Sequence, residues 1–296
     1  MPPLPDSFKA SESSKQEIFE PIVGSLSMGT SVLSANYGSN GSQVDESFLH
    51  TAWQRLCQQL QIQSEDYSAH HYQQLLAHYS QPQRAYHTLA HLTECLIQLE
   101  AVRHLAQQPA LLELALWFHD AVYDPTQDGH DPQYNNEQQS ANWAVQFLQQ
   151  GQATASVQSG LDQDLDIANT AMQMTRPSTN QSIGQANQYM VQTNQTAPKI
   201  VEQLIMATKH HQASSADEQL MVDIDLAILA SQPSRFAQYE QQIRFEYQFV
   251  AQDIFVVKRR EILMQFYQRE RIYQSDYFYQ HLEQTARQNL RQALGL

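Results

Sequence analysis

Hydrophobic side chains recur at three- and four-residue intervals through most of the chain from residue 45 onward. The first such segment follows Asp45, a residue type that caps helices, and it places Leu49, Trp53 and Leu56 on one helical face. Several prolines lie between the periodic segments, where helices have to end or begin. The same spacing predicts further helices over about residues 65–80, 84–106, 110–123, 135–150, 161–175, 198–211, 216–231, 234–251, 252–268 and 276–293.

Evidence for strands is thin in the same part of the chain. Runs of alternating Val and Ile between hairpin turns are missing from residues 45–296, so the sequence predicts one all-α domain there. Two stretches rich in Gln, Asn, Ser and Thr, residues 150–160 and 176–197, predict polar insertions between helices. Residues 1–44 contain many Pro, Ser, Gly and Asn without a sustained period and predict a disordered N-terminal extension.

Charge and composition exclude several classes of protein. The 296 residues include 17 Lys and Arg against 31 Asp and Glu, a net charge of −14 without a basic cluster, which argues against nucleic acid as a partner. No apolar run approaches the roughly 20 residues that span a bilayer, so we expect no membrane partner. The two cysteines, Cys57 and Cys95, exclude a disulfide framework and a Cys-rich zinc site, and we expect a cytoplasmic protein.

Histidines and carboxylates stand out in apolar surroundings. The segment RAYHTLAHL places His87 and His91 four residues apart, on one face of the helix predicted over 84–106. The apolar helix LALWFHDAVYDP ends in His119 and Asp120. Burying an unpaired polar group costs on the order of 2–7 kcal/mol, so these side chains need a compensating partner. A divalent cation satisfies an imidazole and a carboxylate together.

A third segment, MVDIDLAILA, places Asp223 and Asp225 inside another apolar helix. Residues two apart point about 200° away from each other on a helix, so at most one of the two carboxylates can face a shared site. Three separate helices thus supply imidazole or carboxylate groups from apolar faces.

The arrangement of His91, His119-Asp120 and Asp225 resembles the H…HD…D pattern of the HD superfamily of metal-dependent phosphohydrolases. The resemblance runs from about Trp53 to the C-terminus and is closest to a bacterial branch described only as predicted phosphohydrolases. Five motifs stand in the order of that branch: YHTLAH (86–91), WFHDAVYDP (117–125), NNEQQSA (135–141), MATKHH (206–211) and DIDLAIL (223–229). The resemblance implies an HD-domain helical bundle with the metal ligands His91, His119, Asp120 and Asp225.

The first motif is also similar to one in cyclic-nucleotide phosphodiesterases, and this similarity implies further roles. It makes His91 a metal ligand and His87 the proton donor to the leaving oxygen, although Thr88 stands where that family has Asn. Glu137 is similar to a glutamate that holds metal-bound water, which implies either a role next to the metal ligands without binding the ion or a general-base role. Asp120 would bridge to a second ion or orient the water. The reverse assignment, with His87 as the ligand, stays open.

Cationic side chains near these motifs are candidates for binding the phosphate of a substrate: Lys209, His210 and Arg244. His210 and His211 end an apolar helix, where a cation also complements the helix dipole, so a capping role stays open for both.

The resemblance and the ligand types together predict a metal-dependent hydrolase that cleaves a phosphate ester or anhydride of a small metabolite, first of all a nucleotide, by metal-activated water. Imidazole and carboxylate ligands suit Mn, Fe, Co, Ni, Zn or Mg. The alternative is a non-catalytic regulator that retains the HD fold and binds a metal or a nucleotide. His87 and Glu137 favour the enzyme, because a purely structural metal needs neither. Whether the chain forms a homo-oligomer stays open.

Overall fold

The structure, a computed structural model, describes residues 46–127, 135–170 and 197–296, and within 154–170 only the backbone. The chain divides into two units, Met1–Ser39 and Asn40–Leu296, and every described residue belongs to the second unit. The predicted disordered extension over 1–44 therefore lies outside the described residues.

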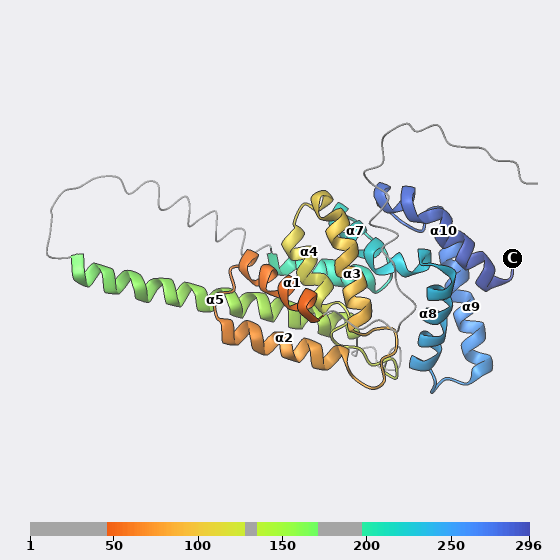
Figure 1. The fold of residues 1–296 in the computed structure, drawn as a ribbon, viewed down its shortest axis with the longest axis horizontal. Coiled ribbons are helices and arrows are strands. Elements are labelled where there is room, and N and C mark those ends of the chain that lie inside the picture. Colours follow the sequence, from red (N-terminus) through yellow and green to blue (C-terminus); the bar gives the residue numbers. More distant parts are fainter. Residues whose placement is uncertain (1–45, 128–134, 171–196) are drawn as a thin grey trace, which may run out of the picture. The chain divides into compact units, whose positions relative to one another are not determined.

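Every regular element in the described part of the chain is a helix, which confirms the predicted all-α fold (Figure 1). None of the described helices is both long enough and apolar enough to cross a membrane. The helices are α1 (Glu46–Gln59), α2 (Glu65–Tyr79), α3 (Leu89–Val102), α4 (Pro109–Phe118), α5 (Asn136–Thr170), a helix over 197–208, α7 (Ala216–Asp225), α8 (Pro233–Glu246), α9 (Gln252–Gln268) and α10 (Asp276–Leu294), with two short 3₁₀ segments, η1 (Arg103–Leu105) and η2 (Leu226–Ala230).

Helix α4 lies at the centre of the core and contacts α1, α3, α5 and α7. Its side chains are buried all around, which explains the unbroken apolar run in its sequence, because a helix that is apolar on every face has to be covered on every face. Trp53 of α1 packs on Trp117 at a ring-centroid distance of 5.2 Å and on Phe147 of α5 at 5.1 Å. These ring contacts fix the position of the C-terminal end of α4.

Several predicted helices have different bounds in the structure, and two of these differences change an interpretation of the sequence. Helix α3 begins at Leu89 rather than near residue 84, because the Thr88 side chain accepts a hydrogen bond from the Ala90 N–H group and caps the helix. His87 therefore precedes the helix, and the prediction that it shares a helical face with His91 is wrong.

The other difference concerns helix α5, which runs without interruption from Asn136 to Thr170. The sequence predicts a polar insertion between two helices at 150–160, whereas the helix continues through this stretch. Polar residues are compatible with a helix that has solvent around it, so polarity alone did not indicate a break. The second predicted insertion, 176–197, lies almost entirely outside the described residues.

Buried carboxylates of α7 cap two other helices. Asp217 accepts hydrogen bonds from the N–H groups of Gln107 and Gln108 at the start of α4, at 2.8 and 2.7 Å. Asp223 accepts from the N–H groups of Gln274 and Ser275 at the start of α10, at 2.8 and 2.7 Å, while burial raises its pKa to about 6. Asp223 thus has a structural role and fixes the rotation of α7 about its axis.

Replacing Asp223 by Ala should lower the free energy of unfolding by about 1–3 kcal/mol, because the N–H groups of Gln274 and Ser275, directly before α10, lose their acceptor inside the protein. Asp253→Ala on the exposed first turn of α9 is the matched control and should change it by less than about 0.5 kcal/mol. Urea denaturation of both variants measures the difference, and equal effects would contradict the capping role.

Candidate metal centre

His119 and Asp120 follow the last residue of α4 directly. The His119 ring is 2 % exposed, and its Nδ1–H group donates a hydrogen bond to the Leu116 carbonyl oxygen at 2.8 Å. This bond fixes the tautomer and leaves the Nε2 lone pair free to bind a proton or a metal ion.

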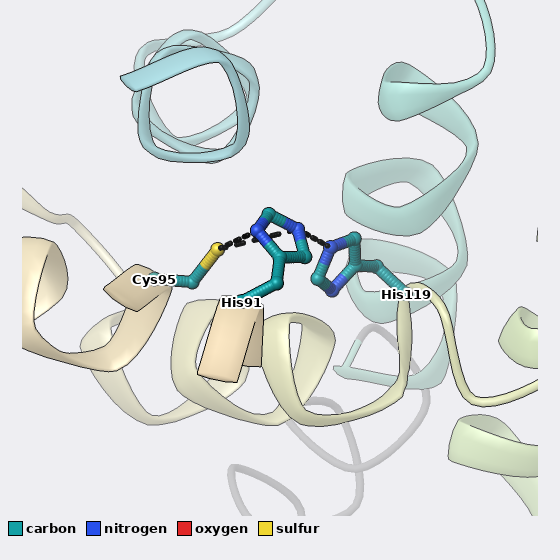
Figure 2. A group of neighbouring side chains, drawn as sticks. All are labelled: His91, Cys95 and His119. Carbon is teal, nitrogen blue, oxygen red and sulfur yellow. Dashed lines mark hydrogen bonds between the residues drawn. The ribbon is translucent and has the colours of Figure 1, made fainter. Parts of the chain in front are cut away.

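His91 lies in the first turn of α3 and faces His119 across a short gap. The two Nε2 atoms are 3.3 Å apart, and the Sγ atom of Cys95, one helical turn further along α3, lies 3.7 Å from the His91 ring nitrogens. Figure 2 shows the His91 ring between the thiol and the second imidazole. All three side chains are buried, and their ligand atoms lie close enough together that the group could bind a metal ion.

Two carboxylates approach the same pair of imidazole nitrogens. Asp120 Oδ2 lies 3.0 Å from His119 Nε2 and 3.5 Å from His91 Nε2. Asp225 Oδ1 lies 3.3 Å from His91 Nε2 and 3.7 Å from His119 Nε2. Ligands about 2.1 Å from one ion are themselves separated by about 3.0–3.5 Å, and three of these four separations lie in that range.

The charges of the cluster also favour a bound cation. Burial by itself would lower the pKa of His119, but the neighbouring Asp120 carboxylate outweighs burial and holds the pKa well above its usual value. With a neutral His119, whose proton is on Nδ1, the buried Asp120 Oδ2 atom has no hydrogen-bond donor. A buried carboxylate oxygen without a donor is costly, and a bound cation would remove that cost.

The structure brings Asp225 rather than Asp223 to the histidines, because Asp223 faces the start of α10.

His211 joins the cluster from the loop after the helix over 197–208, with its Nε2 atom 3.4 Å from Asp225 Oδ2. Its φ angle of 49° is left-handed, a conformation that usually costs a non-glycine residue about 1–3 kcal/mol. The sequence left its role open. Its neighbour His210 is exposed, and the His210 backbone oxygen accepts a hydrogen bond from Arg269.

A cavity of about 500 Å³ opens beside the cluster, and His119, Asp120 and Asp225 form part of its lining. His87, Glu137 and Lys209, all candidates from the sequence, line the same cavity. Neither His210 nor Arg244 belongs to its lining in the described part of the chain. Arg244 instead donates hydrogen bonds to the backbone oxygens of Tyr247 and Val250 at the end of α8. These bonds give Arg244 a structural role behind the cavity wall.

Glu246 at the end of α8 holds the loop before α3. Its Oε1 atom accepts hydrogen bonds from the N–H groups of Ala85, Tyr86 and His87 at 2.7, 2.7 and 3.0 Å. Its Oε2 atom lies 2.7 Å from His87 Nδ1 and accepts a hydrogen bond from the Tyr123 hydroxyl at 2.9 Å. With Nδ1 engaged, Nε2 is the His87 ring nitrogen left for the cavity. Sequence reasoning missed Glu246, because no local pattern links it to a segment about 160 residues away.

Arg84 is a second residue that the sequence did not single out. Arg84 is 6 % exposed. Its guanidinium group donates hydrogen bonds to the backbone oxygens of His87, Asp120 and Ala121 at 2.9, 2.7 and 3.1 Å. It therefore ties the loop that carries His87 to the end of α4, which carries the histidine and aspartate of the cluster.

Comparison of the chain with known protein families, with curated proteins and with solved structures finds no match in any of the three. The fold and the site themselves define the class of protein: an all-α protein with a buried group, His91, Cys95 and His119, that could bind a metal ion.

Burial would raise the pKa of Glu246, but His87 and the backbone donors lower it from the usual 4.5 to about 2. The unfolded chain therefore takes up this proton first on acidification. The ionised Glu246 carboxylate therefore contributes about 3 kcal/mol to the free energy of unfolding. This contribution is complete above pH 4.5 and is lost as the pH falls toward 2. Glu246→Gln should flatten this part of the stability curve, measured by urea denaturation at pH 2–6. If the stability of both proteins depended on pH in the same way, Glu246 would not be the source of this pH dependence.

Proposed function

We propose that the protein is a metal-dependent hydrolase of the HD superfamily that cleaves a phosphate ester or anhydride of a small metabolite, first of all a nucleotide. The observation that carries the proposal is the convergence of His91, His119, Asp120 and Asp225, whose ligand atoms lie 3.0–3.7 Å apart in five measured pairs. The cluster borders a cavity large enough for a small metabolite.

In this proposal the two imidazoles and two carboxylates hold a divalent cation, and Mn, Fe, Co, Ni, Zn and Mg all accept such ligands. The rival set replaces the carboxylates by the Cys95 thiol. The buried Asp120 Oδ2 atom favours the carboxylates, because a bound cation would satisfy it. Cys95 Sγ is 3.7 Å from both ring nitrogens of His91, and Asp225 Oδ1 lies 3.3 Å from Nε2.

A bound divalent cation would supply water with a pKa lowered toward about 7 and would polarise a phosphoryl oxygen. The residues of the chain provide the rest of the chemistry. His87, oriented by Glu246 through Nδ1, directs Nε2 to the cavity, where it can donate a proton to the leaving oxygen. Glu137 lines the cavity as the candidate general base, and Lys209 contributes positive charge for the phosphate.

Adding Mn²⁺ should raise the melting temperature of the full chain, because an ion that binds only the folded state stabilises it by mass action, about 2.7 kcal/mol at a hundredfold excess over Kd. Asp225→Asn should abolish this increase. Asp223→Asn, two residues away and outside the cluster, is the matched control and should retain it. Equal increases in both variants would contradict the proposed ligand set. Loss of the increase in Cys95→Ser would show that the thiol is a ligand.

His87→Ala should keep the Mn²⁺-dependent rise in melting temperature. It should lose about 10²–10⁴-fold in turnover of alkyl phosphate esters, because a positioned general acid typically contributes this much. Hydrolysis of 4-nitrophenyl phosphate, whose leaving group needs little protonation, should fall much less. If the variant loses the metal effect, His87 and His91 exchange roles. Normal metal binding with no turnover by the unchanged protein would favour the regulatory alternative.

A further inference from the structure

Beyond the metal cluster, the cavity has a second wall, made by α8, α9 and the turn between them. The side chains of this wall are largely apolar and aromatic: Tyr239, Ile243, Tyr247, Phe255, Ile262 and Phe266. A substrate whose phosphate lies at the metal cluster would place the rest of its body against this wall. The side chains of this wall therefore determine which kind of group the substrate can carry beyond its phosphate.

The positive charges of this wall are already paired. Lys258 Nζ lies 2.9 Å from a Glu261 carboxylate oxygen, and Arg259 lies 2.5 Å from Glu240. Among the lysines and arginines that line the cavity in the described part of the chain, only Lys209 has no carboxylate within ion-pair distance. A triphosphate, with a charge near −4, is normally bound by several cationic groups, so one free lysine favours a single phosphate group.

Two uncharged polar side chains of the lining are engaged within the protein, whereas the buried Tyr86 hydroxyl has no hydrogen-bond partner in the described part of the chain. The Thr208 hydroxyl donates to the Ile205 backbone oxygen at 2.8 Å, and Asn136 Oδ1 accepts from the Asp124 N–H group at 3.1 Å. A body rich in hydroxyl groups, such as a sugar, would lose water here and regain no hydrogen bond from these two side chains, which costs affinity.

An aromatic surface, by contrast, is fixed in advance. The Arg244 guanidinium lies 4.6 Å from the centre of the Phe255 ring, and its hydrogen bonds to the Tyr247 and Val250 backbone oxygens hold it there. The Phe255 ring lines the cavity and is held by this contact. A rigid aromatic side chain binds a flat ring with little loss of conformational entropy.

We infer that the substrate is a nucleoside monophosphate whose base lies against the α8–α9 wall; this rests on the hydrolase function proposed above. The single phosphate lies between the metal ligands and Lys209. Water adds to phosphorus, the bond from phosphorus to the nucleoside oxygen breaks, that oxygen takes up a proton, and nucleoside and inorganic phosphate are released.

Steady-state kinetics of the full chain with Mn²⁺ test this assignment on three probes: AMP, ribose 5-phosphate and ATP. Stacking of one base on an aromatic side chain is worth about 1–3 kcal/mol, roughly 5–150-fold. The value of kcat/KM for AMP should therefore exceed that for ribose 5-phosphate by about tenfold or more, and ATP should be the poorer nucleotide by about tenfold. Equal values for AMP and either other probe would overturn the inference while leaving the hydrolase function intact.

Phe255→Ala should lower kcat/KM for AMP about tenfold and change that for ribose 5-phosphate less than about twofold. Ile254→Ala is the matched control, because Ile254 is the preceding residue of α9, is 54 % exposed and lies outside the cavity lining. It should leave both substrates unchanged. An equal loss on both substrates in Phe255→Ala would mean that the ring only supports the fold, and this would overturn the inference.

Calorimetric titration of the metal-free chain separates substrate recognition from turnover. AMP should bind more tightly than ribose 5-phosphate, and Phe255→Ala should remove that preference whereas Ile254→Ala should not. AMP that binds no better than ribose 5-phosphate would overturn the inference. If no phosphate ester is turned over, including 4-nitrophenyl phosphate, the proposed hydrolase function fails, and the titration still decides whether the wall binds a nucleoside.

Discussion

The carboxylate of Glu246 receives five donors, and the geometry of the site depends on it. Three backbone N–H groups, the His87 ring and the Tyr123 hydroxyl all converge on its two oxygens. A buried carboxylate is stable only when its charge is met in this way, so the loop before α3 has to bring its donors to the end of α8. The same contacts therefore stabilise the fold, position His87 and join the cavity wall to the metal cluster.

Other buried carboxylates act in a similar manner. Asp217 and Asp223, both on α7, each accept hydrogen bonds from two successive N–H groups at the start of a distant helix. Helix N-termini carry unpaired N–H groups and a partial positive charge, so a carboxylate is their natural partner. Because α7 is fixed at both positions, its rotation is set, and Asp225 is directed to the histidines.

The cluster itself differs from these caps, because its carboxylates meet imidazoles rather than backbone donors. Asp120 Oδ2 remains without a hydrogen bond in a buried position, whereas the capping carboxylates are fully engaged. Stability alone does not account for such an oxygen, and a cation would. Beside this polar cluster, the aromatic wall of α8 and α9 has its charges paired and its Phe255 ring supported by Arg244. One cavity thus lies between a cluster that could bind a cation and a largely apolar and aromatic wall.

The sequence by itself determined the all-α fold, because helical periodicity is a local property. It also singled out His119 and Asp120, which interrupt an apolar helix that has to be buried, and residues two apart on a helix allowed only one of Asp223 and Asp225 to face them. It did not single out Cys95, which the structure places beside His91. Only the tertiary structure decided the start of α3, the role of Glu246 and the place of Arg244. These depend on hydrogen bonds between segments far apart in the chain, such as the one that joins Tyr86 to Glu246, and no local pattern encodes such contacts.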